Sequence, residues 1–273
     1  MTDQTTTAPG RRSGAAIDAA LAQGRKALMV YLPIGYPTVE GSVRAARTAV
    51  EAGADIVELG LPYSDPGMDG EVIQQAATQA LAQGTRISDV LHGVEQVAAT
   101  GAAVLIMTYY NPVLRYGVES FARDLANAGG AGLITPDLVP DEADRWVAAA
   151  DAHDLDKVFL VAPSSTDARL AMTAAASRGF VYAASTMGVT GVRASVDSHA
   201  RELVARTRAA GAQRVCVGLG VSNGQQAAEV AQYADGVIVG SALVRELAPP
   251  DLDAGLAGLR ALVEDLAAGV RGA

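Results

Sequence analysis

The chain has 273 residues, half of them hydrophobic, and a formal net charge of −9 at pH 7. This length suits one α/β barrel or two smaller domains, and an acidic chain without a Lys/Arg cluster argues against nucleic acid as the main partner. The single cysteine, Cys216, excludes an internal disulfide and fits a cytoplasmic protein. Arg11 and Arg12 resemble the start of a twin-arginine signal, but Asp18 interrupts the apolar segment that should follow. We therefore expect neither a signal nor a membrane span.

Residues 1–13 are polar and rich in Thr, which predicts a disordered tail ahead of one domain over residues 14–273. After a first helix over about 13–23, short β-like runs alternate with longer Ala-rich segments of helical periodicity. The expected strands are 27–32, 55–60, 103–107, 132–135, 157–161, 180–184, 214–218 and 236–239. The expected helices lie near 39–52, 71–83, 87–99, 117–128, 141–154, 166–178, 196–210, 223–233 and 251–268.

This alternation of strands and helices predicts a parallel sheet closed into a (β/α)8 TIM barrel with an extra N-terminal helix. The second unit has room for two helices, so we expect it to be enlarged. No break in composition divides the chain, which favours a single domain. In such barrels the chemistry takes place at the carboxyl ends of the strands.

The stretch 55–75 carries an acid inside an apolar strand. Alternation along that strand places Glu58 on the opposite face from Val57 and Leu59. Burial there would raise the pKa of Glu58 toward neutrality, so that it could both give and take protons. A structural glutamate paired with an arginine is the alternative.

Two further acids lie in the loop that follows, which contains proline and glycine. We expect Asp69 to stay ionised on a wet loop and to accept a hydrogen bond from a substrate donor. Alternatively, Asp69 caps the helix that starts near Glu71. Asp65, within Ser64-Asp65-Pro66, is interpreted first as a turn residue.

Other catalytic side chains are absent from the strand ends. Lys26 and Lys157 stand at the starts of strands, so a Schiff-base mechanism has no nucleophile at the barrel mouth. The three histidines, His92, His153 and His199, fall in helical stretches, which argues against a histidine metal site or acid/base. We expect no metal, and assign catalysis to carboxylates and tyrosines.

Aromatic residues and glycines also gather at the strand ends. Six tyrosines suit a flat aromatic substrate, although rim packing is the alternative for each: Tyr31, Tyr36, Tyr63, Tyr109, Tyr110 and Tyr182. Glycines follow the last three strands, within 188–191, 218–220 and 240–241. Their bare backbone N–H groups, with a short helix from Ser241 to Leu247, predict a phosphate site. Tight turns would require glycine as well.

The segment VELGLPYSDPGMDG, with Glu58 and Asp69, resembles the catalytic segment of the tryptophan synthase alpha subunit family. The resemblance runs from about residue 15 to the end of the chain. It continues through YLPIGYP (31–37), MTYYNPV (107–113), LITPDLVPDEA (133–143), FVYAASTMGVTG (180–191), GLGVS (218–222) and GVIVGSALV (236–244).

The resemblance implies a carbon–carbon lyase that cleaves indole-3-glycerol phosphate to indole and glyceraldehyde 3-phosphate, without a metal, a Schiff base or a cofactor on this chain. It implies that Glu58 is the general acid/base and that Asp69 holds the indole N–H. Thr190 would hydrogen-bond Asp69 when the loops close. The implied substrate-binding residues are Tyr31, Met107, Tyr182, Thr190, Gly191, Gly220, Gly240 and Ser241.

The partner implied by the resemblance is a PLP-dependent β subunit in an α2β2 heterotetramer, which uses the indole for tryptophan synthesis. Asp65 and the YYNPV region would lie on that interface. Glu71 departs from the proline that the family usually has there. One alternative is another phosphate-binding barrel such as indole-glycerol-phosphate synthase, whose chemistry requires a lysine near the mouth. The other is a non-catalytic scaffold or activator, in which the acid pair and phosphate cradle would have little reason to coexist.

Overall fold

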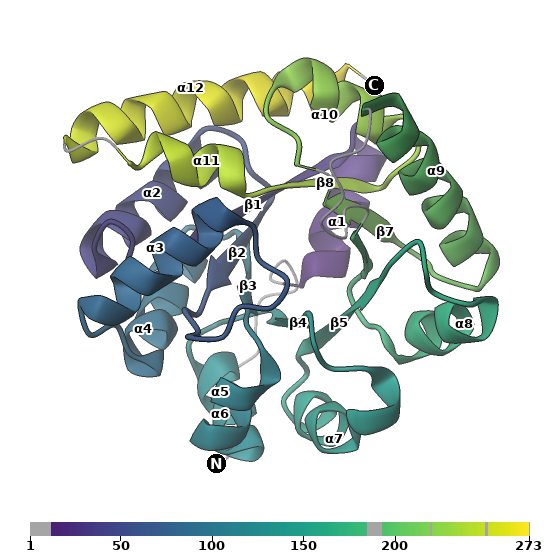
Figure 1. Ribbon diagram of the computed structural model, residues 1–273, viewed down its shortest axis with the longest axis horizontal. Helices are drawn as coiled ribbons and strands as arrows, with labels where there is room; N and C mark the ends of the chain where they lie inside the picture. Colours follow the sequence, from purple (N-terminus) through teal and green to yellow (C-terminus); the bar gives the residue numbers. More distant parts are fainter. Residues whose placement is uncertain (1–11, 185–192, 219, 249–250, 273) are drawn as a thin grey trace, which may run out of the picture.

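The structure, a computed structural model, describes residues 12–184, 193–218, 220–248 and 251–272. Parallel strands form a closed barrel in chain order from β1 to β8, and the helices surround it (Figure 1). The strands are β1 (Ala27–Pro33), β2 (Ile56–Gly60), β3 (Ala103–Met107), β4 (Gly132–Thr135), β5 (Asp156–Val161), β6 (Val181–Ala184), β7 (Val215–Gly218) and β8 (Gly236–Val239). The predicted TIM barrel is confirmed, and each strand boundary differs by at most one residue from its prediction.

The helices follow the predicted order with one addition. They are α1 (Ser13–Ala22), α2 (Val39–Glu51), α3 (Glu71–Ala82), α4 (Ile87–Ala98), α5 (Tyr110–Tyr116), α6 (Val118–Asn127), α7 (Asp144–Ala152), α8 (Asp167–Ala176), α9 (Arg193–Ala209), α10 (Gly224–Ala231), α11 (Ser241–Glu246) and α12 (Leu252–Arg271), with a 3-10 turn η1 (Pro140–Glu142). The second unit holds α3 and α4, as expected.

Helix α5 was not predicted, since the expected helix in this part of the chain began only at about residue 117. Pro112 lies in the first turn of α5, where the backbone N–H has no partner within the helix, so the proline is tolerated. No helix within the described ranges is long and apolar enough to cross a membrane.

Two apolar layers hold the barrel together. Side chains that face inward fill its interior: Met29, Ile56, Leu105, Ile134, Val158, Phe180, Cys216 and Ile238. Outward residues, including Val57 and Leu59, pack against the helices. The predicted alternation in β2 is therefore confirmed, because Ile56 faces inward and Glu58, two residues on, shares its face.

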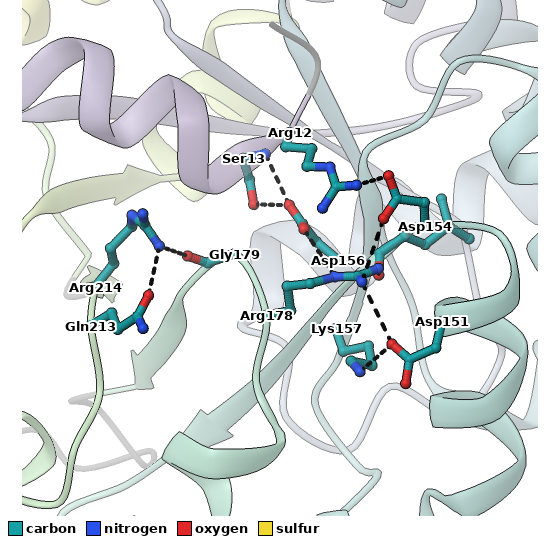
Figure 2. A network of polar contacts seen from close by, with 11 residues as sticks. Arg12, Ser13, Asp151, Asp154, Asp156, Lys157, Arg178, Gly179, Gln213 and Arg214 are labelled. Carbon is teal, nitrogen blue, oxygen red and sulfur yellow. Dashed lines mark hydrogen bonds and ion pairs between the residues drawn. The ribbon is translucent and has the colours of Figure 1, made fainter. Parts of the chain in front are cut away.

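Helix α1 closes the amino end of the barrel, with Ile17 fully buried against the interior layer. The backbone N and Oγ of Ser13 both donate to Asp156 Oδ2, at 2.9 and 2.5 Å. Arg178 Nε lies 3.6 Å from the other oxygen of Asp156 (Figure 2). Ser13 is thus the first residue of a helix that is tied to the start of β5.

Two other carboxylates at the amino ends of strands are paired in the same way. Asp55 accepts from the backbone N–H of Leu28 at 2.9 Å and pairs with Arg25 at 2.7 Å. Asp235 accepts from the first N–H of β7 at 2.9 Å and pairs with Arg208 at 2.8 Å. These carboxylates accept the backbone N–H groups at the strand ends and pair with arginines, so their role is structural.

Replacing Ser13 by alanine should lower the free energy of unfolding by about 1–3 kcal/mol, because the buried Asp156 carboxylate loses its hydroxyl donor. Urea unfolding followed by circular dichroism measures this loss. Ser64→Ala is the matched control, because its hydroxyl bonds Asp65 at 2.6 Å on the surface; it should change stability by about 0.5 kcal/mol or less. Equal effects of the two substitutions would contradict the anchoring role of Ser13.

Candidate active site

A cavity of about 660 Å³ opens at the carboxyl ends of the strands. Most of the expected site residues line it: Tyr31, Asp69, Met107, Tyr182, Gly220, Gly240 and Ser241. Apolar side chains that the sequence did not single out, among them Ile73, Leu160 and Ile238, complete the wall. Thr190 and Gly191 lie outside the described residues.

Glu58 is fully buried beside this cavity and does not itself line it. In the strand register it lies next to Tyr31 of β1, which does. Neither Oε1 nor Oε2 has a hydrogen-bond partner within the described part of the chain. Burial raises the pKa of Glu58 to about 8. The carboxyl therefore holds a proton at neutral pH. No arginine pairs with Glu58 among the described residues, so they do not support the alternative of an arginine-paired structural glutamate.

Two tyrosine rings cross the barrel mouth over glycines. A Cβ added to Gly60 would lie 2.3 Å from the Tyr31 hydroxyl oxygen, and one on Gly240 would lie 3.3 Å from Tyr31 Cβ. Likewise, a Cβ on Gly218 would lie 2.4 Å from the Tyr182 hydroxyl oxygen. The sequence grouped Gly218 with a phosphate loop, whereas the structure also gives it a packing role that the sequence did not reveal.

Both of these phenols stay protonated. Burial, followed by the nearby charges of Asp69 and Glu58, raises the pKa of Tyr31 well above its ordinary value. Burial and the charge of Glu58 have the same effect on the pKa of Tyr182. The rings therefore offer neutral, mostly apolar surfaces to a ligand.

Asp69 lies in the loop between β2 and α3. The N-cap of α3 is Gly70, so the capping interpretation of Asp69 is wrong. Burial raises the pKa of Asp69, and a hydrogen bond with the Tyr109 hydroxyl lowers it in opposition. The loop is therefore drier than the sequence suggested, because Asp69 is packed against the barrel mouth.

The remaining tyrosines differ in position. Tyr63 and Tyr109 line a smaller cavity next to the first, with ring centroids 5.4 Å apart. Tyr36 and Tyr110 line neither cavity. The sequence grouped all four with the tyrosines at the strand ends and assigned none of them individually to substrate binding; Tyr109 follows the end of β3 by two residues.

The expected phosphate side of the cavity is formed by backbone rather than by cations. Gly220 has a φ of +67°, a left-handed conformation that favours glycine. Gly240 is the N-cap of α11 and Ser241 is its first residue. No lysine or arginine is among the described residues of the cavity wall, and the described residues contain no cluster of His, Cys, Asp or Glu suited to a metal ion.

A closed eight-stranded barrel with a cavity at the carboxyl ends of its strands, one carboxylate in the wall and a protonated one beside it, defines a (β/α)8-barrel enzyme that uses acid–base chemistry. The family model described as "Tryptophan synthase alpha chain" matches residues 17–270. The chain therefore belongs to the tryptophan synthase alpha chain family.

Individual relatives agree with the family model. The chain is 60% identical over 260 residues to a tryptophan synthase alpha chain from Mycobacterium marinum, covering 95% of each. Its fold is similar to a solved structure of Mycobacterium tuberculosis tryptophan synthase, with a TM-score of 0.89, 58% identity and coverage of 95% and 98%. A subunit alpha structure from Legionella pneumophila gives a TM-score of 0.87 at 31% identity, covering 96% of this chain and 99% of that one.

The buried carboxyl of Glu58 makes stability depend on pH. Between its ordinary pKa of 4.5 and its folded value of about 8, the folded chain binds a proton that the unfolded chain releases. The free energy of unfolding contributed by this group therefore falls as pH rises through that window. Glu58→Gln, which stays neutral, should exceed the parent stability by a few kcal/mol at about pH 8, and by much less at about pH 5.

Chemical denaturation of both proteins at each pH measures the difference. The control is Glu229→Gln, an exposed position on α10 whose replacement should leave the pH dependence unchanged. If Glu58→Gln follows the same pH curve as the parent, Glu58 is not the protonated group.

Proposed function

We propose that this chain cleaves indole-3-glycerol phosphate to indole and glyceraldehyde 3-phosphate. The observation that carries the proposal is the buried carboxyl of Glu58, whose pKa of about 8 leaves it protonated next to a cavity that suits an aromatic ligand. An acid in this state can donate its proton at neutral pH and then accept another. Membership of the tryptophan synthase alpha chain family supports this substrate and this reaction.

The cavity wall supports one orientation of the substrate. Tyr31, Met107 and Tyr182 would contact the flat indole ring. Gly220, Gly240 and Ser241 would receive the phosphate through backbone N–H groups and the serine hydroxyl, with Gly191 completing the cradle. The carbon–carbon bond to be broken then lies between these two regions, near Glu58 and Asp69.

Two proton transfers by Glu58 balance the reaction. Its proton adds to indole C3, which moves the positive charge onto the ring nitrogen. The resulting carboxylate removes the proton of the glycerol hydroxyl next to the ring, and the electrons of that O–H bond form the aldehyde carbonyl. The electrons of the C–C bond return to the ring, releasing indole and glyceraldehyde 3-phosphate with Glu58 protonated again.

Asp69 would supply the electrostatic part of catalysis. Its carboxylate accepts the indole N–H and stabilises the positive charge that develops on the ring nitrogen. Thr190 would hydrogen-bond Asp69 when the loops close, which excludes water from the site. Two alternatives are less well supported. Indole-glycerol-phosphate synthase chemistry needs a lysine at the mouth, and Lys157 instead contacts Asp151 at 2.5 Å at the amino end of the barrel. A non-catalytic scaffold has no use for a buried protonated acid.

We further propose that the chain requires no cofactor of its own and acts in the cytoplasm. Its partner would be a PLP-dependent β subunit, in an α2β2 heterotetramer that consumes the indole. The family and its solved tryptophan synthase relatives support this assembly. Asp65, exposed in the β2–α3 loop, and the YYNPV segment would contact that partner.

The direct experiment is turnover of indole-3-glycerol phosphate by the chain alone and together with a β subunit, with released indole measured by chromatography. Glu58→Gln should abolish cleavage and leave ligand binding nearly intact, because glutamine fills the same space without a transferable proton. Isothermal titration with the substrate measures the binding. Cleavage by this variant at a rate near the parent's would rule out the role of Glu58, and no indole from the parent under either condition would rule out the function.

Asp69→Asn tests the second acid separately. The variant should lower kcat by at least about a hundredfold, because the amide cannot stabilise a positive ring nitrogen as a carboxylate does. Steady-state kinetics at neutral pH measures the loss. An unchanged kcat would remove Asp69 from the mechanism.

A further inference from the structure

The loop that carries Asp69 is attached to the barrel at the end of β3. The Leu61 N–H donates to the Met107 carbonyl at 3.0 Å, so the chain leaves β2 alongside β3. Further along the loop, the Met68 N–H donates to the Tyr109 hydroxyl at 2.8 Å. Both contacts belong to the same strand end, and the second lies one residue before Asp69.

Tyr109 is itself held rigidly. The N–H before it, from Thr108, donates to a β4 carbonyl at 3.2 Å, and the N–H after it, from Tyr110, donates to the Asp137 carboxylate at 2.9 Å. The residue is 7% exposed, and its ring packs on Tyr63. The backbone on both sides of Tyr109 is therefore hydrogen-bonded and its ring is packed, so its hydroxyl offers the loop a defined point of attachment.

The hydroxyl of Tyr109 lies against the backbone of the loop next to Asp69. A phenol has one O–H donor and accepts through its lone pairs. The oxygen accepts from the Met68 N–H, one residue before Asp69, and Asp69 and Tyr109 line the same smaller cavity, so the O–H can donate to the Asp69 carboxylate. A hydrogen bond from a hydroxyl to a carboxylate is short and directional, and it favours the ionised acid. In agreement, Tyr109 lowers the pKa of Asp69 against the effect of burial.

We propose that Tyr109 is a positioning residue whose hydroxyl fixes the Asp69 carboxylate at the cavity wall in the orientation that receives the ring N–H. The inference rests on the proposed function. Asp69 lines both cavities, whereas Tyr109 lines only the smaller one, so Tyr109 acts through Asp69 and does not touch the substrate.

Tyr109→Phe tests the proposal, because it removes the hydroxyl and keeps the ring that packs on Tyr63. The kcat for indole release should fall about tenfold, with KM changed by no more than about threefold. The acid limb of the kcat/KM profile should move to higher pH, because Asp69 loses the bond that lowers its pKa. The other titratable groups facing this pair all remain in the variant: Tyr31 on β1, Glu58 on β2, Tyr182 on β6 and Asp137 after β4.

Tyr116→Phe is the matched control. Its hydroxyl donates to the Asp124 carboxylate at 2.7 Å, the same kind of bond, but on the surface of α5 and away from both cavities. This variant should keep the parent kcat and acid limb. If the two variants behave alike, the Tyr109 hydroxyl has no special role.

A double-mutant cycle separates positioning from general damage. On the Asp69→Asn background, Tyr109→Phe should lower kcat by less than about twofold, because the group it positions is already gone. A full tenfold loss on that background would overturn the proposal. Hydrogen exchange gives a readout that needs no activity: the Met68 amide should exchange faster in Tyr109→Phe than in the parent. If the parent protein releases no indole, the proposed function is ruled out. The exchange rate of the Met68 amide still shows whether Tyr109 holds the loop.

Discussion

Glu58, a carboxyl group inside the barrel whose oxygens find no donor among the described residues, is the constraint on which the site depends. An ionised carboxylate there would lose its hydration without compensation, so the group keeps its proton up to a pH near its folded pKa of about 8. Burying an unpartnered acid costs stability, and evolution retains such groups where the proton is used. The surrounding wall of neutral rings and glycines maintains that state.

Carboxyl side chains have different neighbours at the two ends of the barrel. At the amino end, Asp55 and Asp235 pair with arginines and accept backbone N–H groups, and Ser13 donates twice to Asp156 (Figure 2). Those acids complete strand ends and fasten α1. At the carboxyl end the acids face phenols instead of guanidinium groups. Stability is thus concentrated at one rim, which leaves the other free for chemistry.

The sequence predicted the barrel and the placement of Glu58 on the opposite face from Val57 and Leu59, because apolar runs, helical periodicity and strand alternation are local signals. It did not predict α5, since a proline in a first helical turn has the same signature as a loop. Nor did it show that Gly60 and Gly218 make room for Tyr31 and Tyr182, because those contacts join different strands. The bond that Tyr109 makes to the Asp69 loop was invisible for the same reason: it depends on how two loops lie in space.

Phenols rather than cations surround Glu58 and Asp69, and this difference in neighbours allows the two acids to have different roles. An arginine in direct contact lowers a carboxyl pKa, as Arg214 does for Asp18 at the amino end. Either acid so paired would be locked as an anion, and Glu58 could no longer donate a proton. A phenol donates one hydrogen bond without adding charge, so it can orient Asp69 and only partly oppose the effect of burial. Glu58 has no hydrogen-bond donor in the described structure, and burial therefore keeps its carboxyl protonated at neutral pH. The two acids therefore differ in two respects: Glu58 is fully buried without a donor, whereas Asp69 is only partly buried and has the Tyr109 hydroxyl beside it.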